Sequence, residues 1–152
     1  MITIKELEKS NARKLLISDF IKKYEHLLPD PYSLHVNIDE YSSKLNEFGV
    51  AFVAQNDEEI IGLISGYIND YVTCNAYLQI IIVRQISQNS GCGSALIRAF
   101  IGKAVSEYKC GNVFLNVDKS NTHAYEVYKH LGFIESKRVH PNPLKQIMQY
   151  TF

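Results

Sequence analysis

Residues 80–96, which read IIIVRQISQNSGCGSAL, constrain the fold of this chain more than any other segment. They begin with four consecutive β-branched residues, a pattern typical of a strand that is buried on both faces in the middle of a sheet. A polar loop follows, and after Gly91 and Gly93 the apolar residues recur at helical spacing as far as about Tyr108. The sequence therefore predicts a central strand, a loop and a long helix in succession.

Gly91 and Gly93 stand where the predicted helix begins. Glycine permits backbone conformations and close approaches that a side chain blocks, and the first N–H groups of a helix have no intrahelical acceptor. Such a terminus favours a bound anion such as phosphate. A Gly-x-Gly pair is equally compatible with a tight turn that binds nothing, so on its own it is a weak signal.

A longer pattern surrounds these glycines. Gln88, Gly91 and Gly93 have the spacing (Arg/Gln)-x-x-Gly-x-(Gly/Ala) at a strand-to-helix junction, which resembles the acyl-CoA signature of the GCN5-related N-acetyltransferase (GNAT) family. A second segment resembles that family's Asn-x-x-Ala-x-x-x-Tyr-x-x-x-Gly-Phe pattern. Its matching residues are Asn121, Ala124, Tyr128 and the run Leu131-Gly132-Phe133. The two motifs together span about residues 77–134.

The periodicities alone predict a mixed α/β chain with one parallel strand pair. Strands at residues 76–83 and 112–117 are joined by the long helix, and the right-handed crossover rule makes them parallel neighbours. The resemblance implies a GNAT-like acyl-CoA N-acyltransferase fold, in which a central mixed sheet is flanked by helices and the parallel pair splays apart around the pantetheine arm. The length of 152 residues fits a single acetyltransferase domain, residues 1–152.

The remaining segments supply the rest of the sheet. We expect an edge strand at residues 2–4, a hairpin at 50–54 and 60–69, and closing strands at 133–138 and 146–152. Gly62 and Gly66, inside the second hairpin strand, indicate a bulge or close packing. A short helix at residues 121–131 is expected to end at Gly132.

Two helices are expected before the hairpin. Ser10 can cap the first and Asn37 the second, and two prolines separate them. The apolar residues expected to face the core are Ala12, Leu15, Leu16, Phe20, Ile21 and Tyr24 in the first helix, and Ile38, Tyr41, Leu45 and Phe48 in the second.

Charge and composition exclude several classes of protein. Sixteen basic and sixteen acidic residues give no net charge, and we expect neither a nucleic-acid nor a membrane partner. Residues 1–10 lack the features of a signal peptide and no apolar run approaches membrane-spanning length, so a cytoplasmic location is expected. Cys74, Cys92 and Cys110 show no metal-ligand spacing, and no metal site is expected.

The resemblance implies acetyl-CoA as the co-substrate. Backbone groups of Ile81, Ile82 and Val83 would bind the pantetheine and acetyl end, with one amide facing the thioester carbonyl. Successive N–H groups of the loop and first helical turn would wrap the pyrophosphate; these residues are Gln88, Asn89, Ser90, Gly91, Cys92, Gly93, Ser94 and Ala95. The loop carries no charge, and Arg84 is the nearest positive residue. Binding would then rely on backbone dipoles, each worth roughly 0.3–1 kcal/mol at a helix terminus.

Tyr128 is the candidate catalytic side chain. By resemblance, its phenol, which is protonated at neutral pH, hydrogen-bonds or protonates the departing CoA thiolate. Tyr125 and Tyr128 are also compatible with two core aromatics on one helix. Asn121 either holds the cofactor arm or caps the helix. Cys92 at a helix N-terminus suggests a reactive thiol, but its place in the phosphate loop argues against an acyl-cysteine intermediate.

No general base is evident from the sequence. Tyr77 stands where some members of the family carry a glutamate. Asp70, His35 and a chain of water molecules stay open as proton acceptors, and His123 lies close to the second motif.

The leading hypothesis is an acetyl-CoA-dependent N-acetyltransferase that acetylates a primary amine by direct attack in a ternary complex. The alternative, motivated by the neutral loop and the missing base, is a non-catalytic acyl-CoA-binding or regulatory module. The acceptor would be a small-molecule amine or a peptide N-terminus, and the protein a monomer or homodimer. The polar residues expected along its approach are Tyr24, Tyr32, Tyr41, Asp70 and Tyr71.

Overall fold

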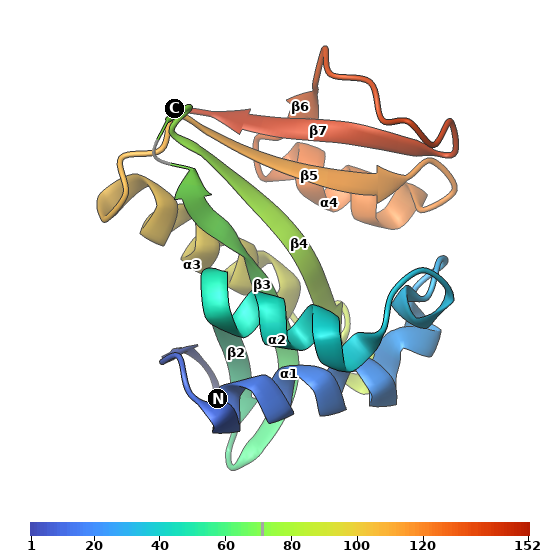
Figure 1. Cartoon of the computed structure of the whole chain (residues 1–152). Helices are drawn as coiled ribbons and strands as arrows, with labels where there is room; N and C mark the ends of the chain where they lie inside the picture. Colours follow the sequence, from blue (N-terminus) through green and yellow to red (C-terminus); the bar gives the residue numbers. More distant parts are fainter. Residues whose placement is uncertain (71) are drawn as a thin grey trace.

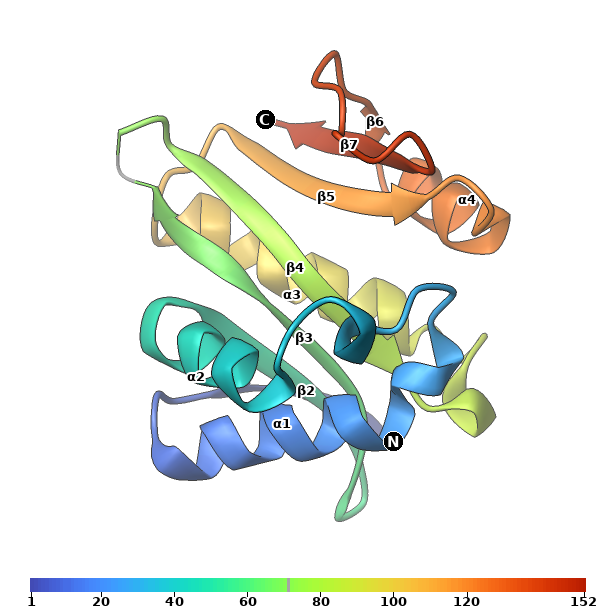
Figure 2. The same ribbon diagram turned by 45° about the vertical axis from the view of Figure 1, so that its right-hand side comes forward.

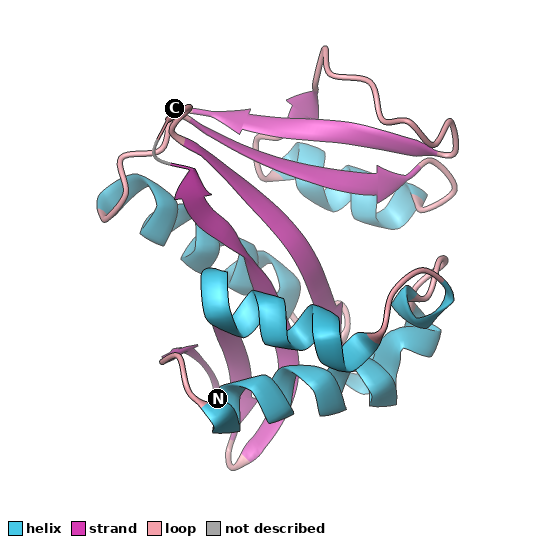
Figure 3. Cartoon of the chain, viewed as in Figure 1, coloured by secondary structure: helices cyan, strands magenta, loops and turns pink. Residues whose placement is uncertain are grey.

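The computed structural model describes residues 1–70 and 72–152, and for residues 69 and 70 the backbone alone. Over these residues a seven-stranded mixed sheet runs in the order β1-β2-β3-β4-β5-β7-β6. The strands are β1 Ile2–Leu7, β2 Val50–Asn56, β3 Glu59–Asp70, β4 Asn75–Val83, β5 Asn112–Asp118, β6 Ile134–Glu135 and β7 Lys145–Thr151. The helices are α1 Asn11–Tyr24, α2 Ile38–Phe48, α3 Cys92–Ser106 and α4 Thr122–His130, with short 3-10 helices η1 Glu25–Leu27, η2 Tyr32–Leu34 and η3 Gln85–Ser87. The order of the strands and α-helices agrees with the one predicted from the sequence (Figure 3).

The sheet divides at its central strand, β4. This strand pairs with β3 over most of its length, but with β5 only from Asn75 to Tyr77, in parallel. β5 then leaves β4 and pairs with β7 over its whole length. Figures 1 and 2 show β4 and β5 diverging from the end at which the C-terminus lies. The splayed parallel pair expected from the resemblance is therefore present.

Helices cover both faces of the sheet, with α1 and α2 in front and α3 behind in the view of Figure 1. On the front face, Ile17, Ile21 and Leu45 form a buried cluster with Ile80 and Ile82 of β4. On the other face, the buried side of α3 packs against β2, β3 and β4. The apolar run at residues 80–83 thus contacts core on both faces, as its composition predicts.

The two glycines of β3 show both features predicted from the sequence, close packing at Gly62 and a bulge at Gly66. Gly62 packs against α3, where an added Cβ would lie 3.0 Å from Cys92 Sγ. At Gly66 the register shifts, and Gln79 of β4 has no opposite residue in β3. A Cβ on Gly66 would lie 2.3 Å from the carbonyl oxygen of Tyr77. Glycine at both positions lets neighbouring elements approach closely, and at Gly66 it does so where β4 bulges.

The helix ends follow the predicted signals. The side chain of Ser10 accepts a hydrogen bond from the N–H of Arg13, and Asn37 accepts one from Glu40. Gly132 follows α4 with a φ of 108°, in the range that favours glycine.

The inward faces of the first two helices differ from the prediction. Ala12 and Leu15 are exposed, and Arg13 faces the interior with 5% exposure. Its guanidinium donates to three backbone carbonyl oxygens at the ends of β1 and α2. An arginine satisfied in this way is invisible to an apolar pattern. Phe48, also expected inside, is 56% exposed at the last position of α2.

The strand expected at residues 133–138 is much shorter, since β6 covers only Ile134–Glu135. The chain turns immediately after it, where the hydroxyl of Ser136 accepts a hydrogen bond from the N–H of Arg138. Local side-chain bonding of this kind competes with strand pairing.

Candidate active site

The free edge of β4 presents backbone groups to the gap between the two halves of the sheet. The N–H of Arg84 donates to the carbonyl oxygen of Ile61 at 2.9 Å, which fixes the alternation of hydrogen bonds between β3 and β4. Ile82 therefore directs its N–H and C=O toward β3, whereas Ile81 and Val83 direct theirs away from it. The backbone groups of Ile81 face the gap at a level where β5 no longer pairs with β4.

A cavity of about 320 Å³ runs from this edge to the start of α3. Gly91, the N-cap of α3, has a φ of 84°. An added Cβ on Gly91 would meet nothing within 4 Å, and one on Gly93 would meet only the Val83 side chain at 3.8 Å. The first N–H groups of the helix thus face open space, which suits a phosphate group. The side-chain amide of Gln88 donates to the carbonyl oxygen of Val83 at 3.2 Å and holds the loop against β4.

Most of the residues implied by the resemblance line this cavity, which we call the cofactor cleft. They are Ile81, Ile82, Val83, Gln88, Asn89, Gly91, Gly93, Ser94 and Asn121, together with Tyr128. Ser90 and Ala95 do not line it. The hydroxyl of Ser90 donates to the carbonyl oxygen of Ser87. The N–H of Ala95 donates to the carbonyl oxygen of Gly91 at 3.0 Å, which is the first hydrogen bond within α3.

Cys92 also lies outside the lining, because its side chain packs into the core with 1% exposure. Burial raises the pKa of its thiol, whereas a reactive cysteine at a helix N-terminus requires a lowered one. The thiol is therefore unsuited to carrying an acyl group.

The cofactor cleft is nearly free of charge. Among the described residues that line it, none is Lys or Arg, and His123 in the first turn of α4 is the basic side chain. Arg84 instead forms an ion pair with Glu59 at 3.3 Å and lines a separate surface groove beside α1.

Helix α4 forms the opposite wall of the cofactor cleft. Asn121, Ala124 and Tyr128 are three and seven residues apart, so they lie on one face of the helix. Asn121 Oδ1 accepts from the N–H of Ala124 at 3.2 Å, which makes Asn121 the N-cap of α4 while its side chain also lines the cleft. Both roles left open by the sequence are compatible with this position.

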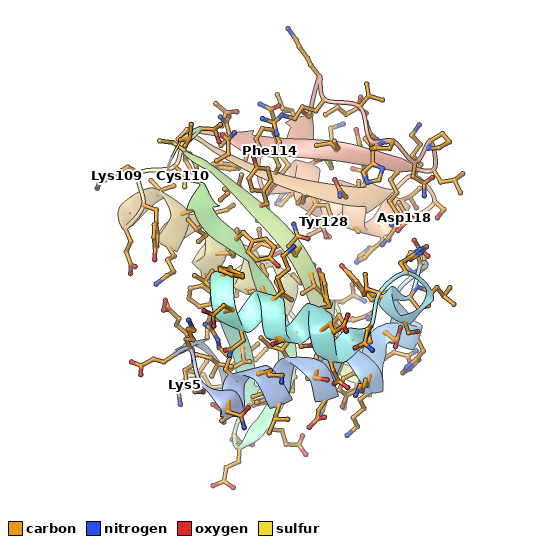
Figure 4. All side chains as sticks on the ribbon, viewed as in Figure 1. Lys5, Lys109, Cys110, Phe114, Asp118 and Tyr128 are labelled. Carbon is orange, nitrogen blue, oxygen red and sulfur yellow. The ribbon has the colours of Figure 1, made fainter. Side chains whose placement is uncertain are left out.

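Tyr128 is 8% exposed, and its ring lies 5.9 Å from that of Phe133. Its hydroxyl forms no hydrogen bond to any described residue. Figure 4 shows Tyr128 and Asp118 on the side of the β5–β7 half that faces α1 and α2. Burial raises the pKa of Tyr128 to about 12, so the phenol keeps its proton at neutral pH and is available as a donor.

A second, larger cavity of about 510 Å³ lies between the α1–α2 connection and the β5–β7 half. We call it the acceptor cavity. It shares Leu28, Ile81, Asn121 and Tyr128 with the cofactor cleft. The two cavities therefore meet between the backbone of Ile81 and the side chain of Tyr128.

Tyrosine hydroxyls line the β4 side of the acceptor cavity. Tyr32 donates to the carbonyl oxygen of Gln79 at 2.6 Å, and the rings of Tyr32 and Tyr41 stack with centroids 5.3 Å apart. Burial raises the pKa of both phenols above the ordinary range, so neither ionises at neutral pH. Tyr32 and Tyr128 line the same cavity.

Charged side chains bridge the far side of the acceptor cavity. Asp30 accepts from His35 Nε2 at 2.7 Å and from Lys145 Nζ at 3.1 Å, and Lys145 lies 3.8 Å from Asp118. The hydrogen bond from His35, followed by that from Lys145, lowers the pKa of Asp30. This chain of contacts joins the α1–α2 connection to the ends of β5 and β7.

The sequence identified only part of the acceptor cavity. Tyr32 and Tyr41 line it as expected, whereas Tyr24 packs on Phe20 and lines the surface groove beside α1. The side chain of Asp70 and the whole of Tyr71 lie outside the described residues. The lining residues that sequence reasoning missed include Asp30, Asn116, Asp118, His140, Asn142 and Lys145. Asn116 and Asp118, alternating at the carboxyl end of a strand, were the available signal, because ligands bind at such ends in open α/β sheets.

The described residues contain neither a cluster of metal-ligand side chains nor a membrane-spanning helix. Within them, no three His, Cys, Asp or Glu side chains come together as metal ligands. None of their helices is long and apolar enough to cross a membrane.

Residues 11–133 match the model of the acetyltransferase (GNAT) family. N-alpha-acetyltransferase 30 of Dictyostelium discoideum is 31% identical over 125 residues, which are 81% of this chain and 65% of that protein. The N-alpha-acetyltransferase of Sulfurisphaera tokodaii is 30% identical over 143 residues, 88% of this chain and 83% of that protein. A spermine/spermidine N(1)-acetyltransferase of Bacillus subtilis is 28% identical over 72 residues, 47% of each chain. The chain belongs to the GNAT acetyltransferase family.

Solved structures agree on the fold. The ribosomal-protein-S18-alanine N-acetyltransferase of Escherichia coli superposes with a TM-score of 0.76 at 20% identity, over 99% of this chain and 94% of that one. A PaiA N-acetyltransferase of Thermoplasma acidophilum, in complex with coenzyme A, gives a TM-score of 0.73 at 16% identity, over 100% of this chain and 99% of that one. At these identities the likeness establishes the mixed α/β GNAT fold alone.

Proposed function

We propose that this protein is an N-acetyltransferase that transfers the acetyl group of acetyl-CoA to a primary amine by direct attack in a ternary complex. The observation that carries the proposal is the meeting of two cavities between the backbone of Ile81 and the side chain of Tyr128. A thioester bound along β4 in the cofactor cleft would be open at this meeting point to an amine in the acceptor cavity.

The groups at the meeting point suit the chemistry of acyl transfer. The N–H of Ile81 faces the gap and can donate to the oxyanion that forms on the thioester carbonyl, a contact worth about 3–4 kcal/mol of barrier. The hydroxyl of Tyr128 can protonate the departing thiolate, because it keeps its proton and has no competing partner among the described residues.

Direct attack is favoured over a covalent enzyme intermediate. Cys92, the cysteine nearest to the cofactor cleft, is buried in the core with a raised pKa. Because this thiol is withdrawn from the cleft, we take the amine itself to attack while acetyl-CoA is bound.

The acceptor is a small-molecule amine or a peptide N-terminus. The proteins similar to this chain carry names of both kinds, N-alpha-acetyltransferase and spermine/spermidine acetyltransferase. The matches to the N-alpha-acetyltransferases cover 81% and 88% of the chain, and the match to the Bacillus protein covers 47%. These extents support a peptide N-terminus as the first acceptor to try.

A second candidate is a non-catalytic acyl-CoA-binding or regulatory module. The neutral lining of the cofactor cleft favours it, and so does Tyr77 at the β4 position where a carboxylate is found in some members of the family. Such a module would bind acetyl-CoA and release no CoA thiol with any amine.

The test is release of CoA thiol from acetyl-CoA in the presence of a free-N-terminus tetrapeptide or spermidine, each compared with its form acetylated on every amine. An N-acetyltransferase releases thiol with at least one free amine and not with the blocked one. Tight binding of acetyl-CoA without amine-dependent release would establish the second candidate instead.

A further inference from the structure

A histidine–aspartate pair lies in the acceptor cavity, and the proposed function leaves it without a role. His35 directly follows η2, and its Nε2 lies 2.7 Å from Asp30 Oδ1. Both side chains line the same cavity as Tyr128. Because a carboxylate only accepts, the neutral imidazole carries its proton on Nε2 and its lone pair on Nδ1. Nδ1 forms no hydrogen bond to a described residue.

The segment that carries this pair is anchored next to the meeting point of the two cavities. The hydroxyl of Tyr32 donates to the carbonyl oxygen of Gln79, two residues before Ile81 on β4. The N–H of His35 in turn donates to the carbonyl oxygen of Tyr32 at 2.9 Å. The imidazole is therefore attached through one short 3-10 turn to the strand edge that would bind the thioester.

The charges beside the imidazole suit a cationic acceptor. Asp30 and Asp118 are negative and Lys145 is positive, so these three side chains together carry one negative charge. They come from the α1–α2 connection, the end of β5 and the start of β7. The other titratable groups that line the cavity are Tyr32, Tyr41, Tyr128 and His140.

None of those other groups is a suitable base. Burial raises the pKa of Tyr32, Tyr41 and Tyr128, so all three stay protonated and act only as donors or relays. Nδ1 of His140 already accepts from the N–H of Asn142 at 2.9 Å, which places the proton of that imidazole on Nε2. Its lone pair is therefore occupied.

Building on the proposed acetyl transfer, we propose that His35 is the general base, which accepts at Nδ1 a proton from the acceptor ammonium, and that Asp30 is its positioning residue. The protonated imidazole then passes this proton to water at the open mouth of the cavity. The free amine attacks the thioester carbonyl, a C–N bond forms and the C–S bond breaks. Tyr128 gives its proton to the departing sulfur. The attacking nitrogen then loses its second proton, which restores the proton of Tyr128. An ammonium and acetyl-CoA thus yield an acetamide, CoA thiol and one proton in solution.

The test compares the pH dependence of kcat in the wild type, His35→Gln, Asp30→Asn and His26→Gln, with saturating acetyl-CoA. The tetrapeptide and spermidine serve as acceptors. His26 is a matched control, because it is exposed in the neighbouring η1 and lines neither cavity. Calorimetric titration with CoA measures cofactor binding in each variant, so that a folding defect is seen separately.

We expect His35→Gln to lower kcat about 100-fold at pH 7, within the range for loss of a general base, with CoA affinity unchanged. Its kcat should rise about tenfold per pH unit as water removes the amine proton instead. Asp30→Asn should lower kcat less than His35→Gln does, and should move the acidic limb of the curve of kcat against pH to lower pH. His26→Gln should match the wild type. An active wild type whose pH profile survives in His35→Gln overturns this inference alone. A wild type that releases thiol with neither amine overturns the proposed function and this inference with it.

Discussion

At the scale of single residues, Tyr128 joins the two halves of the proposed site. It is held by the aromatic contact with Phe133, and its backbone carbonyl accepts from the N–H groups of Leu131 and Phe133, so the end of α4 fixes its position. Its hydroxyl is left for a ligand, because no described residue bonds it.

Replacing Tyr128 by Phe should lower kcat by about 100-fold or more, since the thiolate would lose its proton donor, and leave the dissociation constant of CoA nearly unchanged. Steady-state thiol release and calorimetry measure the two quantities. Tyr125→Phe is the matched control, because Tyr125 is on the same helix and its hydroxyl bonds Glu135 at 2.9 Å, outside both cavities. Equal turnover in the wild type and Tyr128→Phe would remove Tyr128 from the mechanism.

The buried phenol also makes stability depend on pH. Its pKa is raised from 10.0 to about 12, so above pH 10 the unfolded chain loses this proton while the folded protein keeps it, and folding stability falls as pH rises. Between pH 9 and 11 we expect the wild type to lose about 1.4 kcal/mol more than Tyr128→Phe, one pKa unit being worth about that much. Urea denaturation at the two pH values measures the difference. Parallel losses in the two proteins would show that the phenol is not desolvated.

At the scale of secondary-structure elements, the strand β4 and the N-terminus of α3 define the cofactor cleft. In the proposed function, backbone groups do most of the binding there, so we expect substitutions that keep the backbone to have little effect. Gly93 is an exception, because its missing side chain leaves the approach to the first helical N–H groups open.

Gly93→Val should therefore weaken acetyl-CoA binding about tenfold or more by placing methyl groups in front of these N–H groups, with thermal stability of the free protein close to that of the wild type. Calorimetry and a thermal unfolding curve test the two parts. Gly102→Ala, a second glycine of α3 with open space around it and no place in the cleft, should leave CoA binding unchanged. Unaltered affinity in Gly93→Val would mean that the cofactor does not reach this turn.

Elements with strong local signals were predictable from the sequence. The run at residues 80–83, the caps Ser10 and Asn37 and the Gly132 stop each encode structure within a few residues. One wall of the cofactor cleft, formed by β4 and the start of α3, likewise comes from elements adjacent in the chain. The burial of Arg13 was not predictable, since it depends on carbonyl groups of α2 that are distant in sequence.

The acceptor cavity was largely unpredictable for the same reason. Its charged chain joins Asp30, Asp118 and Lys145, which come together only when the α1–α2 connection closes over the ends of β5 and β7. No periodicity within any one of these segments records that contact.

At the scale of the whole molecule, the sheet acts as two halves joined at the narrow end of β4 and β5. One half carries α1, α2 and α3 and presents the β4 edge, while the other carries α4 and Tyr128. Acetyl-CoA inserted between them would contact both, so ligand binding should stabilise the whole fold and not one helix alone.

The most direct measurement is thermal unfolding of the protein with and without acetyl-CoA, with ATP and NAD as controls. A ligand at 100 times its dissociation constant stabilises the native state by about 2.7 kcal/mol, which for a chain of this size raises Tm by about 5–10 °C. We expect this rise with acetyl-CoA and none with ATP or NAD. No rise at millimolar acetyl-CoA would contradict the assignment of the cofactor cleft, and with it the proposed acetyl transfer.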